Sequence, residues 1–361
     1  MVKVIRQWYE RNFHDEEAVL LLLLLVVGIA VVVFYGGILA PVIGALVLAF
    51  LLQGVVMQLS RWRVPHLVAV SVSTLLLITL LVVSLIGLLP LLRDQVNNMV
   101  QELPRIITLL QEQLGLLPER YPGFLTPSQV AELSELLNRE LRDFGQLVST
   151  FLLSNISNVL SFIVYLVLVP IMVFFFLKDK DQLLGWCGRF LPDERPLLNT
   201  IYEEMNVQMA NYVRGKAIEM FIVGGVSFFA FAWLELNYAA LLAILVGLSV
   251  IIPYIGAFLV TIPVLLVAFL QWGWGSEFIW LTVVYLLIQA LDGNVLVPLL
   301  FSEAVNLHPI AILLAILFFG GIWGLWGVFF AIPLATLIKA VLNAWPNLEE
   351  RNDSAELPGE A

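Results

Sequence analysis

Five long stretches of this sequence contain no Asp, Glu, Lys or Arg, and they limit the possible folds more than any other feature. They make up half of the chain and span residues 18–60, 64–92, 144–177, 236–276 and 304–338. Because a membrane crossing needs about 20 apolar residues, each stretch can hold a transmembrane helix and the three longest can each hold a hairpin. Only 13% of all residues are charged, against about 25% in soluble domains. We therefore predict an all-α, polytopic membrane protein.

Charge and motif content exclude several other functions. The net charge is −10 and no cluster of Lys and Arg occurs, which excludes a nucleic-acid partner. Cys187 is the only cysteine, so an intrachain disulfide and a cysteine metal site are excluded, and we expect this side chain to be buried. The three histidines are too scattered for a metal centre. No phosphate-binding loop, zinc-protease motif or nucleophile elbow is present. We expect no cofactor, no metal and no enzymatic activity.

Glycines and charged blocks divide the chain further. Gly36 and Gly37 predict a tight turn between the first two helices, and helix three is expected at about 64–90. Residues 93–143 form a polar block between helices three and four, and residues 178–216 form a second polar block between helices four and five. The expected segments are transmembrane helices one to three in 1–92, an extracytoplasmic helical domain in 93–143, helix four in 144–177, a cytosolic helical segment in 178–216, helix five with a transport unit in 217–340, and a cytosolic tail in 341–361.

The basic residues predict the orientation in the membrane. With the N-terminus in the cytosol, thirteen of the eighteen Lys and Arg residues lie on the cytosolic side, which is the asymmetry of the positive-inside rule. Residues 93–143 are then extracytoplasmic, and both termini and residues 178–216 are cytosolic. No cleavage site follows the first apolar run, so we expect that run to remain as a membrane anchor.

Both polar blocks show the apolar spacing of amphipathic helices. In the first block, Thr126 and Gln129 predict a capping box, and the stripe that follows consists of Val130, Leu133, Leu137, Leu141 and Phe144. This helix packs either in a self-contained hairpin or against another subunit. In the second block, an equivalent face predicts a helix that runs into helix five, with Leu198, Ile201, Met205, Met209 and Tyr212 on it.

One pattern occurs twice in the last third of the chain, about 71 residues apart. Leu236-Asn-Tyr precedes an apolar arm and a bend at 252–256, and Leu307-His-Pro precedes an apolar arm and a bend at 320–327. Arms such as 239–252 rise about 21 Å, which is short of the roughly 30 Å hydrocarbon core and favours re-entrant hairpins over full crossings. A full-length span at about 278–297 separates the two units, which therefore form an inverted repeat.

The two bends supply the first group of candidate pathway residues, which are Pro253, Tyr254, Gly256, Gly320, Gly321 and Gly324. Irregular backbone at membrane depth is tolerated only where protein buries it or where it lines a wet cavity. Broken helices in corresponding positions of two repeats indicate a transporter's binding site. The alternative is that these Gly and Pro residues only permit close helix packing.

Charged and polar residues near this repeat supply the second group. Asp292 lies between long apolar flanks, with Gln289 and Asn294 beside it, and a carboxylate at membrane depth is costly enough to indicate a proton or cation site. The alternative is a protonated or interfacial carboxylate that caps a broken helix. Further pathway candidates are Glu303, Asn306 and His308, although an interfacial histidine is the competing interpretation for the last. For Glu219, interfacial anchoring is expected.

Five motifs carry a resemblance to a known family. They are LVLVPIMVFFFLKDK at 166–180, IPYIG at 252–256, DGNVLVP at 292–298, VNLHP at 305–309 and GGIWG at 320–324. With these motifs in place, the sequence resembles the autoinducer-2 exporter family from residue 1 to 346. The resemblance implies a bacterial inner-membrane transport protein that assembles as a homo-oligomer, a pentamer. Family members are associated with export of the signal autoinducer-2, and some relatives with sodium/proton exchange.

We therefore predict a secondary transporter for a small polar solute, with an autoinducer-2-like signal and ion coupling as specific expectations. The inverted hairpins and the span at 278–297 would form its moving unit, and the other helices its scaffold and oligomer contact. The partners expected are the solute or ion, the lipid bilayer and further copies of the chain. A sodium/proton antiporter, a channel and a non-transporting scaffold are the alternatives.

Overall fold

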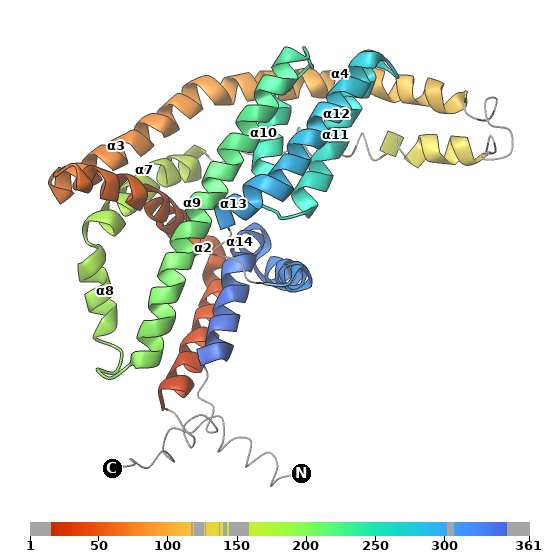
Figure 1. The fold of residues 1–361 in the computed structure, drawn as a ribbon. Helices are drawn as coiled ribbons and strands as arrows, with labels where there is room; N and C mark the ends of the chain where they lie inside the picture. Colours follow the sequence, from red (N-terminus) through yellow and green to blue (C-terminus); the bar gives the residue numbers. More distant parts are fainter. Residues whose placement is uncertain are drawn as a thin grey trace, which may run out of the picture. The chain divides into compact units, whose positions relative to one another are not determined.

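In a computed structural model, the protein is described over residues 16–116, 128–136, 159–301 and 307–344 and at positions 118, 126, 138, 139 and 143. No strand occurs among these residues, so the all-α prediction is confirmed. The helices are α2 (Glu16–Arg61), α3 (His66–Val83), η1 (Ser84–Leu88), α4 (Leu89–Gly115), α7 (Val159–Lys178), α8 (Lys180–Gly188), α9 (Pro196–Trp233), α10 (Ala239–Ser249), α11 (Ile255–Trp272), α12 (Ser276–Leu291), η2 (Asp292–Leu296), α13 (Val297–Phe301) and α14 (Pro309–Ala344), drawn in Figure 1.

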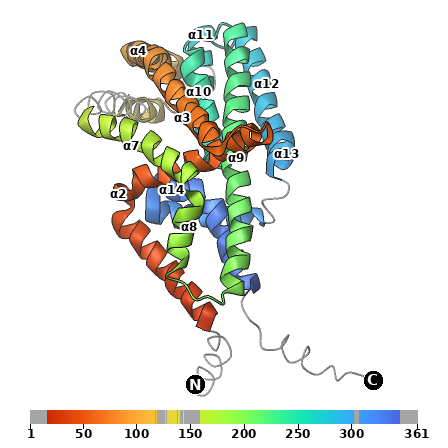
Figure 2. The same cartoon turned by 90° about the vertical axis from the view of Figure 1, so that its left-hand side faces the viewer.

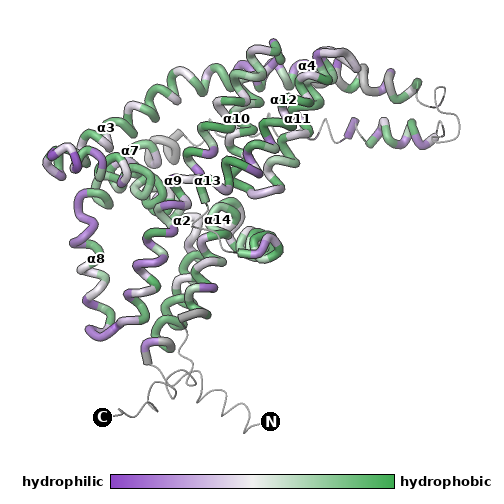
Figure 3. Tube along the Cα trace, viewed as in Figure 1, coloured by the Kyte–Doolittle hydropathy of each residue, from purple (hydrophilic) through white to green (hydrophobic). Residues whose placement is uncertain are grey.

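Six helices in the described part of the chain are long and apolar enough to cross a membrane. They are Val19–Arg61, His66–Glu102, Pro196–Trp233, Ile255–Trp272, Ser276–Phe301 and Pro309–Leu342. Two shorter apolar helices, Tyr165–Lys178 and Ala239–Ser249, accompany them. Figure 3 shows the apolar colour predominating along α3, α11 and α12, whereas α8 is largely hydrophilic. A polytopic membrane protein is the architecture that these helices support.

The first apolar stretch is one helix, so the predicted turn at Gly36 and Gly37 is wrong. Helix α2 has 46 residues and contains Pro41, and it bends along its length (Figure 2). Glycine here serves close packing, because a Cβ on Gly36 would lie 2.6 Å from Nε1 of Trp323. The bend is consistent with the proline, which removes one hydrogen bond from the helix interior.

Helix three also continues beyond its predicted end near residue 90. One turn of π-helix, η1, joins α3 to α4 without a break in helical backbone, and α4 continues to Gly115. The capping box at the start of the next helical segment is confirmed. The Thr126 N–H donates to Oε1 of Gln129 at 2.9 Å, and the Gln129 N–H donates to Oγ1 of Thr126 at 3.4 Å. Of the predicted stripe, Val130 is buried and Leu133 is exposed, and Leu137, Leu141 and Phe144 lie outside the described residues.

The chain divides into two compact units. The first comprises residues 1–71, 171–217 and 299–361, and the second comprises residues 72–170 and 218–298. Helix α9 contributes its first half to the first unit and its second half to the second unit. The cytosolic helix and helix five of the sequence prediction are therefore one continuous helix, as the amphipathic pattern indicated.

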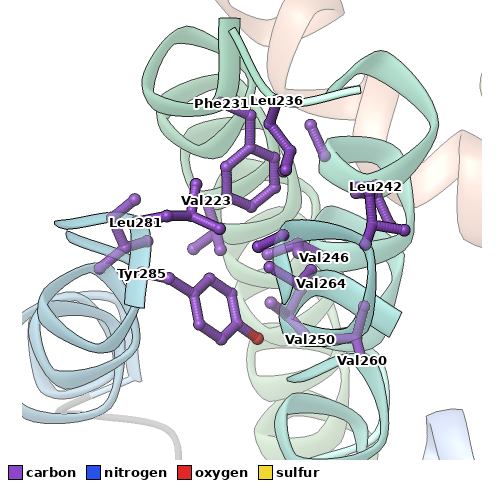
Figure 4. Packing of buried hydrophobic residues seen from close by; sticks show 14 residues of the cluster. Val223, Phe231, Leu236, Leu242, Val246, Val250, Val260, Val264, Leu281 and Tyr285 are labelled. Atoms are coloured by element: carbon purple, nitrogen blue, oxygen red, sulfur yellow. The ribbon is translucent and has the colours of Figure 1, made fainter. Parts of the chain in front are cut away.

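The core of the second unit is formed by the second half of α9 together with α10, α11 and α12 (Figure 4). Phe231 and Tyr285 are fully buried in it, with ring centroids 6.2 Å apart. The Tyr285 hydroxyl lies 3.0 Å from the Thr261 hydroxyl, so its polar end is satisfied inside the apolar core. Gly224 and Gly247 let α9 and α10 approach closely, since a Cβ on Gly247 would lie 3.1 Å from Cα of Gly224.

The first unit joins α2, the first half of α9 and α14. Its apolar contacts include Leu21, Ile201 and Val341, one from each helix. The carboxylate of Glu17 accepts a hydrogen bond from the Leu198 N–H at 2.7 Å, which satisfies one free donor at the start of α9. The prediction that Cys187 is buried is wrong, because it lies exposed on the short helix α8.

Candidate functional site

The first predicted bend joins α10 to α11 through a strained turn. Tyr254 has φ +61° and ψ −51°, which is the rare γ-turn conformation with positive φ. The Ile255 N–H donates to the Pro253 carbonyl at 2.7 Å and closes this turn. Gly256 follows and is buried, and a Cβ there would collide with the carbonyl oxygen of Ser249. The two arms therefore meet in a backbone contact that only glycine permits.

The second predicted bend lies inside α14. Gly324 has φ +61° and ψ −137°, a combination that is close to a region used by glycine alone. The chain on either side packs together, because a Cβ on Gly327 would collide with the carbonyl oxygen of Phe319 and lie 3.1 Å from the nitrogen of Gly320. A Cβ on Gly321 would meet no atom within 4 Å. Helix α14 is thus two helical arms joined at Gly324, as the repeat predicted.

The lengths of the helical arms do not decide whether the first hairpin is re-entrant or crosses the membrane. Helix α10 has 11 residues and rises about 16 Å, whereas α11 has 18 residues and rises about 27 Å. One arm is therefore short of the hydrocarbon thickness, and the other nearly matches it. The helix breaks are confirmed, and the re-entrant arrangement stays a prediction.

The candidate carboxylate lies where the backbone of α12 changes to the π-helix η2. Asp292 is half-buried and is bonded within the protein. Gln289, one turn earlier, is also half-buried, and its Nε2 has no hydrogen-bond partner among the described residues. Asn294 is exposed, and its Nδ2 donates to the Ala290 carbonyl at 2.8 Å. Single π-helical turns occur frequently at functional sites, and this one places a carboxylate beside an amide with an unused donor.

The remaining predicted residues give less support for a site. His308 is exposed, and its Nδ1 accepts a hydrogen bond from the Ile310 N–H at 3.3 Å. That contact caps the first turn of α14 and accounts for the histidine structurally. Glu303 and Asn306 lie outside the described residues.

The candidate residues divide between the two units. The second unit holds the bend at 252–256 and the segment with Gln289, Asp292 and Asn294, while the first unit holds His308 and the bend at Gly324. Within the second unit, α12 packs beside α11 (Figure 1). Each unit therefore contains one hairpin of the repeat.

Two charged residues at the predicted start of helix five are buried. Lys216 is 6% exposed and Glu219 is 2% exposed, so the expectation of interfacial anchoring for Glu219 is wrong. Both are bonded within the protein, and Nζ of Lys216 lies 5.2 Å from the ring centroid of Phe301. The spacing of Lys216 and Glu219 could have indicated this burial, because opposite charges three residues apart lie on one face of a helix. Buried ionisable groups in membrane helices are rare and functional by default.

A polar cavity in the second unit was missed altogether. It measures about 190 Å³, lies at the start of the first hairpin, and is lined in part by Glu102, Arg105, Asn237, Tyr238 and Gln271. These side chains offer a carboxylate, a guanidinium, two amides and a phenol. A donor and acceptor set of this kind suits a small hydroxylated solute. Sequence spacing could not reveal the cavity, since its residues come from three separate segments of the chain.

Hydrogen bonds hold the loop of this cavity in place. The Asn237 N–H donates to Oε1 of Gln271 at 2.8 Å, and Nε2 of Gln271 donates to the Glu235 carbonyl at 2.8 Å. Burial, then the hydrogen bond and the negative charge of Glu102, raise the pKa of Tyr238 to about 12. Tyr238 therefore stays a neutral hydrogen-bonding group over the physiological range.

Known proteins resemble this chain along most of its length. A family model described as AI-2E family transporter matches residues 22–347. The chain is 46% identical over 353 residues to PerM of Escherichia coli (strain K12), which is named as a permease, and the match covers 96% of this chain and 98% of that protein. It is 26% identical to the AI-2 transport protein TqsA of the same strain, over 86% of each chain. It is also 26% identical to YueF of Bacillus subtilis (strain 168), named as a transport protein, over 86% of this chain and 84% of that one.

Proposed function

This chain belongs to the AI-2E family of transporters, and from that premise we propose that it is an ion-coupled exporter of a small polar solute. The observation that carries the proposal is the pair of helix breaks at Tyr254 and Gly324, which occupy corresponding positions of the repeat. Broken helices in paired repeats supply backbone donors and acceptors to a solute or an ion. Both hairpins would then contribute to the transport pathway.

Asp292 is our proposed coupling residue. Its carboxylate lies beside the π-helical turn and near the unused amide donor of Gln289. A carboxylate in an apolar helix can exchange a proton or hold a cation as its surroundings change during transport. Asn294 is a less direct participant, since its amide already bonds to Ala290.

The polar cavity supports the choice of solute class. Neutral hydroxyl groups match its carboxylate, amides and phenol, and a volume of about 190 Å³ suits a molecule of roughly ten non-hydrogen atoms. Because one relative is named for AI-2 transport, an AI-2-like signal is the first solute to test. In this proposal the cavity is a docking point on the extracytoplasmic side of the pathway.

The membrane arrangement forms part of the same proposal. We place residues 93–143 outside and residues 178–216 inside the bacterial inner membrane, because of the distribution of Lys and Arg. We place both termini in the cytosol, because Glu17 at the start of α2 bonds to Leu198 in that same cytosolic block. A homo-oligomer, a pentamer, is the proposed assembly. The hairpins are proposed to be re-entrant, with their tips accessible to water.

Cysteine labelling tests this arrangement. Single cysteines replace Ser128, Gln182, Ile255 or Leu325 in a Cys187→Ser background, and intact cells are treated with a membrane-impermeant maleimide. We expect labelling at position 128 and protection at position 182. A small permeant thiol reagent should reach both tip positions, with a rate that changes when solute is added. The opposite pattern at 128 and 182 contradicts the orientation, and two inert tips in an active protein contradict the re-entrant hairpins.

Flux into proteoliposomes tests the transport mechanism. We expect saturable solute flux that follows a proton or sodium gradient in the wild type. Asp292→Asn keeps the shape and removes the charge, so the assembled protein should survive while gradient-coupled flux falls at least about tenfold, as expected for loss of one essential charged group. Glu277→Gln, which removes an exposed carboxylate at the start of the same helix, is the matched control and should keep most of the flux. Unchanged flux with unchanged ion dependence in Asp292→Asn removes this residue from the mechanism.

The same assay separates the alternatives. Cation exchange that proceeds without any organic solute and depends on Asp292 would indicate a sodium/proton antiporter. Flux that does not saturate would indicate a channel, and its complete absence for every solute and ion would indicate a scaffold. Asp292 is the one observation that favours the antiporter, whereas the polar cavity favours an organic solute.

A further inference from the structure

A groove with a volume of about 740 Å³ lies within the first unit, formed by α2, the end of α7, α8 and α9. In Figure 1 these helices are drawn in red, light green and green. The walls are mainly apolar, and their side chains include Leu46, Phe50, Val56, Leu183 and Leu184. The three leucines are about 40% exposed, so this wall offers apolar surface to an occupant.

One end of the groove carries positive charge. Arg61, His66, Lys178 and Lys180 line it, and Asp181 is the acidic residue among them. Nζ of Lys178 lies 3.5 Å from Oδ1 of Asp179, which partly satisfies that lysine. Arg61 and Lys180 make no ion pair with any residue in the described part of the chain. Two cationic groups therefore remain for an anionic occupant.

The dimensions match one leaflet of a bilayer. The α2 residues that line the groove run from Leu46 to Arg61, a rise of about 22 Å at 1.5 Å per residue. Half of the hydrocarbon core is about 15 Å thick, and the headgroup region adds several ångströms. The basic end and the apolar wall of the groove are therefore arranged like the phosphate and the acyl chains of a phospholipid.

We propose that this groove binds an anionic phospholipid of the cytosolic leaflet. The phosphate lies at Arg61 and Lys180, and an acyl chain lies along Leu46, Phe50 and Leu184. Basic pockets between membrane helices on the cytosolic side are suited to anionic headgroups. The site goes beyond the transport function, and only its leaflet depends on the proposed orientation.

The test uses the full chain, purified in a non-ionic detergent and depleted of lipid. Binding of phosphatidylglycerol is measured by thermal shift and by native mass spectrometry, with phosphatidylcholine and soluble glycerol phosphate as comparison ligands. We expect a preference for phosphatidylglycerol over phosphatidylcholine and no shift with glycerol phosphate. Arg61→Gln combined with Lys180→Gln should lower the affinity about thirtyfold, and Lys180→Gln alone about fivefold. Arg189→Gln, an exposed cation outside the groove, is the matched control and should bind normally.

Leu184→Gln tests the apolar wall and should weaken phosphatidylglycerol binding while the basic end is intact. Three results overturn the proposal. They are equal phosphatidylglycerol binding by the wild type and the Lys180→Gln variant, equal binding of phosphatidylcholine, and a shift reproduced by glycerol phosphate alone. Efficient disulfide cross-linking between copies through Leu184→Cys, in the Cys187→Ser background, would instead assign the groove to a contact between subunits.

Discussion

The two hairpins of the repeat begin from similar sequences but turn by different physical means. The first turns at Tyr254, a large residue in a conformation that is strained for it, and the surrounding core of α9, α10, α11 and α12 stabilises the bend. The second turns at Gly324, whose conformation is natural for glycine, and aromatic side chains surround it, with Trp323 and Phe330 stacked at 5.8 Å. The two repeats therefore bend at corresponding positions, but the backbone is strained at the first bend and unstrained at the second.

The difference has a functional consequence. Strained residues persist only where surrounding packing imposes them, and they concentrate at sites that switch or bind. Tyr254 is 60% exposed, so its ring contributes little packing in return for the strain. We expect the first hairpin to hold the conformation that changes during transport, and the second to act as a fixed arm.

The largest effect is expected where both hairpins depend on close backbone contact. Gly256→Val and Gly327→Val each place a branched side chain against a backbone carbonyl, that of Ser249 or Phe319. Because backbone yields less than a flexible side chain, each change should lower the free energy of unfolding by at least about 3 kcal/mol and abolish flux. Thermal unfolding and yield of assembled protein measure this.

Gly28→Val is the control for these two variants. A Cβ on Gly28 would meet no atom within 4 Å, so stability should change by less than about 0.5 kcal/mol, as at an open surface position. If Gly327→Val behaves like this control while Gly256→Val unfolds the protein, the arms of the second hairpin are not in contact and the comparison fails.

An intermediate effect, of opposite sign in the two hairpins, is expected at the turn residues themselves. Gly324→Ala forces a side chain into a conformation that only glycine favours and should cost about 2 kcal/mol of stability. Tyr254→Gly relieves strain and should raise stability by about 1 kcal/mol. If the strain serves transport, Tyr254→Gly lowers flux although the protein becomes more stable. A loss of stability in both variants would contradict the distinction between a strained and an unstrained turn.

Local signals in the sequence predicted the parts of the fold that depend on local physics. The capping box of Thr126 and Gln129, the two helix breaks and the amphipathic face of α9 all follow from residues close together in the chain. The turn at Gly36 was wrong because a glycine pair has two uses, and only tertiary structure shows that Trp323 packs there. A glycine in the sequence does not by itself show whether the helix bends there or another element packs closely against it.

The candidate site was predicted less completely for the same reason. Asp292 is conspicuous as a lone carboxylate in an apolar segment, and the bends stand out by glycine and proline content. Glu102 and Tyr238 lie far apart in the sequence, and only folding brings them to one cavity. Glu219 looked interfacial because it follows two basic residues, yet its burial depends on neighbours from other elements.

The smallest expected effect concerns how the two hairpins start. The first starts at Tyr238, whose hydroxyl meets Glu102 of another helix, whereas the second starts beside His308, which caps its own helix. The folded protein raises the pKa of Tyr238 from 10.0 to about 12, so the unfolded chain loses this proton first. The contribution of Tyr238 to the free energy of unfolding is complete below pH 10 and is lost as the pH rises through about 12.

Thermal unfolding between pH 9 and 12 checks this prediction. Tyr238→Phe removes the ionisable group, so its stability should fall less steeply with pH in that range than that of the wild type. Glu102→Gln removes one negative charge but leaves the burial that contributes most to the shift, so the slope should lie between the two. Tyr202→Phe, a change on the exposed face of α9, is the control and should match the wild type. Identical slopes in all four proteins would mean that Glu102 and Tyr238 do not meet, and the polar cavity at the start of the first hairpin would lose its support.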